Sequence, residues 1–187
     1  MAQKVWSLEV LSAGRIDTDA ILINRAYDTS DRTDWEKWVA CDSFSKMSSR
    51  ASAAFIPALV KASGYTEEEI TGGEWKPDGE LLDVLGETEH MRWCAFHFAN
   101  GYRRMSEEEL ERNIENYVRC REKGLHLPRI TKNAEQRTHA CLIPYDQLDA
   151  LSERENAATG RNTDYRQLDI NNVLMIPRIL KARKGEI

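Results

Sequence analysis

The chain has 187 residues, 41% of them hydrophobic, with a formal net charge of −5 and an isoelectric point near 5.5. This length can bury one sizeable core, so we expect a single domain spanning residues 1–187. The acidic balance argues against nucleic-acid polymers and anionic membranes as partners, because either would favour a basic face.

Apolar side chains recur with helical spacing along most of the chain, which predicts an all-α fold. The expected helices, in chain order, cover residues 17–27, 31–44, 46–64, 88–101, 106–124, 144–160 and 168–184. Pro57 falls inside the third of these helices and predicts a kink or break there. Residues 65–80 are expected to form a turn-rich connector, and residues 125–139 a long loop.

Cysteine usage and the first residues indicate the compartment. The four cysteines are scattered without a C-x-x-C pair, which favours free thiols in a reducing environment. The first ten residues lack the apolar segment of a signal peptide, and the apolar run at 53–60 is far shorter than a membrane span. We therefore expect a cytoplasmic protein that does not enter the membrane.

The helix expected from Thr88 presents two different faces. An apolar stripe that should face the core is formed by Met91, Cys94, Ala95 and Phe98. The roughly opposite side carries Trp93 between two histidines, with an acidic residue at its edge: His90, Trp93, His97 and Glu89. Either this helix packs on both sides, or the second face is a recognition surface for a planar ligand. The two histidines are about 10 Å apart along the axis, which disfavours a shared metal ion.

Five segments of the chain follow the order of a known set of motifs. They are INRAYD at 23–28, SSRASAAFIPALVKASG at 48–64, EHMRW at 89–93, HACLIPYDQL at 139–148 and LDINNVLMIPRIL at 168–180. These segments resemble the ryanodine-receptor repeat (RyR) domain family. EHMRW is similar to the E-x-x-H-x-x-W helix that opens the repeat, and HACLIPYDQL is similar to its H-P-x-L-V-P-Y-x-x-L signature.

The resemblance covers residues 18–187 and implies a mainly helical fold with short antiparallel strand pieces. It implies a helical extension at 18–80 and a repeat core at 81–187 with an inserted helix at 106–124. It also implies sensing or binding rather than chemistry, since paired repeats of the receptor channels accept an adenine nucleotide between tryptophans of this motif. A single copy needs a second chain to rebuild that pair, so a homodimer is expected.

By this analogy Trp93 is a stacking platform, His90 and Glu89 contact base or ribose edges, and arginines meet phosphate. The expected ligand-binding residues are Trp93, His90, Glu89, Arg50, Arg103, Arg104, His97, Tyr102, His139 and Tyr145. The ligand is expected to be nucleotide-like, adenine-containing or a cyclic signalling nucleotide. Neither a cofactor, a metal ligand nor a catalytic residue is expected.

Two other function classes stay open at this stage. One is a protein-interaction module whose Trp93 face docks a partner. The other is an enzyme that cleaves such a nucleotide, with His90 or His97 as general base and Glu89 orienting it.

Overall fold

The computed structural model describes residues 15–25 and 30–186, so the expected helix residues 26–27 lie outside the described part. Of the described residues, 68% are helical, and they contain one small sheet, which confirms the all-α class. The chain divides into two compact units. The central unit is residues 90–169, and the terminal unit combines the described residues up to Glu89 with residues 170–186. The single-domain boundaries expected from the sequence stay a prediction.

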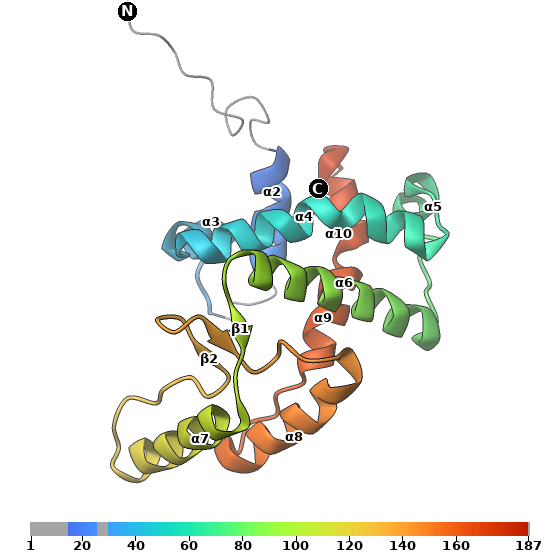
Figure 1. Cartoon of the computed structure of the whole chain (residues 1–187). Helices are drawn as coiled ribbons and strands as arrows, with labels where there is room; N and C mark the ends of the chain where they lie inside the picture. Colours follow the sequence, from blue (N-terminus) through green and yellow to red (C-terminus); the bar gives the residue numbers. More distant parts are fainter. Residues whose placement is uncertain (1–14, 26–29, 187) are drawn as a thin grey trace, which may run out of the picture. The chain divides into compact units, whose positions relative to one another are not determined.

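The terminal unit is a group of packed helices around its own apolar core (Figure 1). Its elements are α2 (Arg15–Arg25), α3 (Asp34–Ala40), α4 (Ser43–Ser63), α5 (Glu67–Gly72), the first half of α6 (Gly79–Ala99), the end of α9 (Tyr165–Leu174) and α10 (Ile176–Arg183). Helix α2 packs against α3 and α4, and α10 packs against α2 and α5. The fully buried side chains of this core include Ile23, Leu59, Ile70, Leu85, Ile176 and Ile179.

Helix α4 continues through Pro57, so the expected break does not occur. Proline has no backbone N–H, and the carbonyl four residues earlier, that of Ala53, therefore loses its helical donor. The Arg183 guanidinium of α10 reaches this oxygen, with Nη2 at 3.5 Å, while its Nε donates to the buried carboxylate of Asp19 at 2.9 Å. Arg183 thus supplies a donor to the carbonyl that Pro57 leaves without one, and it pairs with the buried carboxylate of Asp19.

Two other expected helices are interrupted. The second ends at Ala40, and the Asp42 side chain accepts from the Ser45 N–H to cap a new helix. The last is divided into α9 and α10 at Met175, two residues before Pro177. In both places a local signal, the Asp42 cap or Pro177, divides the helix, although the apolar spacing continues from one helix into the next.

The central unit combines two further helices with a three-stranded sheet. Its elements after α6 are β1 (Arg103–Arg104), α7 (Glu107–Glu122), β2 (Lys132–Asn133), β3 (Thr138–His139), the short 3-10 helix η1 (Tyr145–Gln147) and α8 (Leu148–Thr159). β3 lies between the other strands, parallel to β1 and antiparallel to β2. The loop expected at 125–139 is therefore partly a hairpin, and only one of the two strand pairings is antiparallel.

Helix α7 forms as expected from its capping box. Ser106 accepts from the Glu109 N–H, and the Glu109 carboxylate accepts from the Ser106 N–H at 2.8 Å. Its apolar side buries Leu110 and Tyr117 in the core of the central unit. Arg154 of α8 links the two helices through ion pairs with Glu107 and Glu111 of α7, at 2.6 and 2.5 Å.

Across residues 15–25 and 30–186, none of the helices has both the length and the apolar character needed to cross a membrane.

Candidate functional site

Helix α6 buries the face that was expected to be the polar one. Met91 and Phe98 of the expected core stripe are 58% and 53% exposed, and Ala95 is exposed as well. By contrast, His90 and His97 are only 3% and 2% exposed. The helix also begins at Gly79, capped by Asp78, rather than near Thr88. The prediction that Met91, Ala95 and Phe98 face the core is wrong.

Glu89 is fully buried in the terminal unit, where its carboxylate accepts a hydrogen bond from the Ser52 hydroxyl at 2.8 Å. Asn172 of α9 lies 3.5 Å from the same oxygen. A carboxylate enclosed and hydrogen-bonded in this way has a structural role in its own unit. The geometry therefore does not favour the expected contact between Glu89 and a ligand edge.

His90 forms the most enclosed ion pair of the central unit. Its Nδ1 lies 3.0 Å from the Asp169 carboxylate, and its Nε2 lies 2.9 Å from the Ile143 carbonyl oxygen. Both partners are acceptors, so both ring nitrogens must carry a proton. Burial by itself favours the neutral ring, but the hydrogen bonds to Asp169, Cys94 and Ile143 prevail and raise the pKa of His90 to about 10.

This imidazolium bears on the hydrolase alternative. Cys94 Sγ lies 3.4 Å from His90 Nε2, so nucleophile, imidazole and carboxylate stand in the order of a catalytic triad. A general base needs an unprotonated nitrogen near neutral pH, however, and a pKa near 10 removes it. The group that orients the ring is Asp169, not Glu89 as expected.

An aromatic cluster surrounds Trp93 in the central unit. The His97 ring centroid lies 3.9 Å from that of the half-buried indole, and the His139 ring meets the indole edge-on at 4.9 Å. Tyr102 packs edge-on against His97 at 5.1 Å. The structure thus brings together Trp93, His90, His97, Tyr102, His139 and Tyr145, six of the ten expected residues.

The turn after α6 explains how Tyr102 joins this cluster. The helix ends at Asn100–Gly101 as expected, and Gly101 adopts φ 77°, where a side chain would also meet Arg137 Nη1 at 3.0 Å. The Tyr102 N–H then bonds back to the His97 carbonyl at 3.0 Å. Strand β1 follows directly beside β3, which carries His139.

The two imidazoles beside Trp93 are neutral. His97 Nδ1 donates to the Trp93 carbonyl at 3.0 Å, and His139 Nδ1 accepts from the Cys141 N–H at 3.2 Å. Burial, with smaller contributions from nearby positive charges, lowers the pKa of His97 to about 4 and that of His139 well below its ordinary value. These two rings therefore carry no charge near pH 7, whereas His90 of the same cluster is charged and paired with Asp169.

Positive side chains stand around these neutral rings. The positive charge of Lys132 on β2 lowers the pKa of both imidazoles, and its Nζ lies 5.7 Å from the centre of the Tyr102 ring. The charge of Arg92 likewise lowers the pKa of His97, and that of Arg129 lowers the pKa of His139. None of these three cations was among the residues predicted from the sequence. Lys132 and Arg129 lie shortly before His139 in the chain, but the position of the β2–β3 pairing was not predicted.

Two of the three arginines expected to bind phosphate pair with carboxylates instead. Arg50 belongs to the terminal unit, where its guanidinium pairs with Asp17 at 2.6 Å and lies over the Trp38 ring. Arg103 forms a two-point ion pair with Glu109, at 2.6 and 2.8 Å. Arg104 is exposed on β1. None of the three is part of the Trp93 cluster.

Comparisons with protein families, curated proteins and solved structures give no match to this chain. The similarity to the RyR repeat therefore stays a hypothesis. Among the described residues, no group of three or more His, Cys, Asp or Glu side chains is placed to hold a metal ion.

Proposed function

We propose that the chain is a non-enzymatic binding module for a small nucleotide-like ligand, and that the Trp93 cluster of the central unit binds it. The observation that carries the proposal is a half-buried indole beside the neutral rings of His97 and His139, whose pKa values are lowered by the positive charges of Lys132, Arg92 and Arg129. Flat apolar rings bordered by cations complement a ligand that joins a planar base to a phosphate.

The contacts within the cluster define how such a ligand would bind. His97 already covers part of the indole at 3.9 Å, so the ligand base would contact the part of Trp93 that remains exposed. The edge-on His139 ring borders the same indole, and its Nε2–H is the donor that remains after Nδ1 accepts from Cys141. Lys132 would meet the phosphate. The resemblance to the RyR repeat, whose tryptophans border an adenine nucleotide, supports the same ligand class.

Replacing Trp93 by alanine is expected to weaken nucleotide binding by about tenfold or more, because base–aromatic stacking contributes about 1–3 kcal/mol per base. Calorimetry and thermal shift with adenine nucleotides, cyclic dinucleotides and NAD measure this. Lys132→Gln should weaken binding of a nucleotide more than that of its nucleoside. Trp35→Ala is the matched control, because Trp35 is 64% exposed on α3 in the other unit.

Trp93 also packs against the core of the central unit, so Trp93→Phe accompanies the alanine variant and circular dichroism checks that both fold. The proposal fails if no nucleotide of the panel stabilises the wild-type chain at millimolar concentration, or if both Trp93 variants bind as the wild type does.

A protein-interaction module is the second candidate, and the exposed apolar face of α6 favours it. Met91, Ala95 and Phe98 are spaced i, i+4 and i+7, so they form one exposed stripe on the central unit's part of the helix. The expected homodimer belongs to the same question. Light scattering distinguishes one chain of 21.5 kDa from a mass twice as large.

A further inference from the structure

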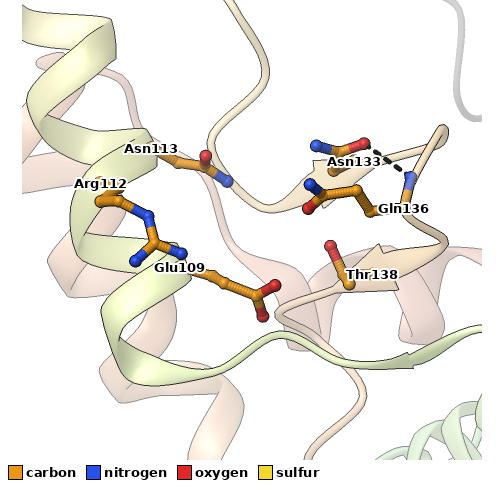
Figure 2. Close-up of a pocket in the computed structure, with 6 residues that line it drawn as sticks. All are labelled: Glu109, Arg112, Asn113, Asn133, Gln136 and Thr138. Carbon is orange, nitrogen blue, oxygen red and sulfur yellow. Dashed lines mark hydrogen bonds between the residues drawn. The ribbon is translucent and has the colours of Figure 1, made fainter.

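A small hollow opens in the central unit between the start of α7 and the β2–β3 hairpin (Figure 2). Its volume is about 150 Å³. Every side chain that lines it is polar, three from α7 and three from the hairpin: Glu109, Arg112, Asn113, Asn133, Gln136 and Thr138. Figure 2 shows these two sets facing one another across the hollow.

Thr138 is the first sign that the hollow receives a ligand. The residue is only 1% exposed, yet among the described residues its hydroxyl oxygen has no hydrogen-bond partner. A buried hydroxyl without a partner is destabilising, and valine would fill the same space on a β-strand without that cost. Packing therefore does not explain why this position on β3 carries a hydroxyl.

The charges in the hollow are the second sign. The Glu109 carboxylate is ionised and already has partners. Its two-point pair with Arg103, the hydrogen bond from the Ser106 N–H and the charge of Arg112 lower its pKa to about 2. Arg112 makes no ion pair with any carboxylate of residues 15–25 and 30–186. Arg112 is exposed, and its positive charge lowers the pKa of both Glu108 and Glu109, so the N–H groups of its guanidinium remain as donors beside the hollow.

The side-chain amides have defined orientations. Asn113 donates to the Ile130 carbonyl at 2.8 Å, and its oxygen remains as an acceptor. Asn133 accepts from the Gln136 N–H at 3.0 Å, and its NH₂ group remains as a donor. The hollow thus offers donors and acceptors in fixed places around one cationic group.

We propose that this hollow binds a small hydroxycarboxylate. The planar guanidinium of Arg112 matches a carboxylate group, and the Thr138 hydroxyl together with the Asn133 amide matches a neighbouring hydroxyl group. The volume of about 150 Å³ suits a compound of this size and is small for a nucleotide. The site shares no residue with the Trp93 cluster and does not depend on the function proposed for that cluster.

Lactate and malate serve as probes, with acetate and glycerol as compounds that carry only one of the two groups. We expect lactate or malate to raise the melting temperature of the wild-type chain more than acetate or glycerol does. Arg112→Gln should reduce the affinity at least tenfold. Arg119→Gln is the matched control, because Arg119 is exposed two turns further along α7 and does not line the hollow.

The Thr138→Val variant distinguishes a role of the hydroxyl in ligand binding from a role in folding. The variant should be at least as stable as the wild type without ligand, because it removes a buried hydroxyl that lacks a partner. It should nevertheless bind the hydroxycarboxylate at least fivefold more weakly, while binding of acetate changes little. The proposal is wrong if neither probe binds at 10 mM, roughly the weak limit for a ligand this small. It is also wrong if both variants bind as tightly as the wild type.

Discussion

Replacing Asp169 by asparagine is expected to lower the free energy of unfolding by about 3–5 kcal/mol at pH 6.5, as found when one partner of a buried ion pair is removed. Asparagine keeps an acceptor near His90 Nδ1 but removes the negative charge that stabilises the imidazolium. His90 is only 3% exposed, so water cannot replace that charge.

The effect has a defined pH dependence. The pKa of His90 is raised from 6.5 to about 10 in the folded chain, so the stabilisation is fully present below pH 6.5 and is lost as the pH rises through 10. The Asp169→Asn variant should therefore differ most from the wild type below pH 6.5 and least near pH 10. Urea unfolding at several pH values measures this difference.

Asp149→Asn provides the control for this experiment. Asp149 pairs with Arg166 at 2.9 Å but is exposed, and a surface ion pair contributes only about 0–1 kcal/mol. Titration of the four histidine signals by NMR gives an independent result, in which the pKa of His90 falls in the Asp169 variant. An unchanged His90 titration, or equal costs of the two substitutions, would show that Asp169 does not hold the charge.

Local signals in the sequence were sufficient for much of the fold. The start of α7 near Ser106 and the stop of α6 at Asn100–Gly101 lie where they were expected, since each depends on residues three or four apart. Pro57 misled the prediction because its compensation comes from Arg183, distant in sequence. The resemblance implied short antiparallel strand pieces, but the position of the β2–β3 hairpin was not predicted, because strands of two residues leave no periodic pattern.

The orientation of α6 could not be predicted from its apolar pattern. Apolar side chains are distributed around the whole helix, so periodicity does not select one face. The face that is buried depends on whether its polar groups find partners. Glu89 finds Ser52, and His90 finds Asp169, 79 residues further along the chain. A scale of residue hydrophobicity contains no such information.

The same reason explains the mixed result for the candidate site. The motif resemblance selected Trp93 and His139, the helical spacing added His97, and these three rings do meet in the central unit. The choice of arginines rested on their position in the chain, whereas the cations near the rings are set by tertiary contacts. Lys132, for example, lies beside the rings because β2 pairs with β3.

Replacing His97 by phenylalanine is expected to remove the part of the acid-induced loss of stability that comes from protonation of this buried ring. The pKa of His97 falls from 6.5 to about 4 on folding, chiefly because the ring is buried. Its neutral form therefore stabilises the fold above pH 6.5, and this contribution is lost as the pH falls from 6.5 through 4. The shift corresponds to about 3 kcal/mol over that range.

Phenylalanine preserves the ring contact with Trp93 and cannot take up a proton, so the variant's free energy of unfolding should fall less steeply between pH 6.5 and 4. Carboxylates titrate in the same range, and the comparison must therefore be between variant and wild type rather than between pH values. His126→Phe is the control, because His126 is exposed in the chain between α7 and β2. Parallel profiles for wild type and the His97 variant would mean that His97 can be protonated without cost, which its enclosure between Trp93 and Tyr102 argues against.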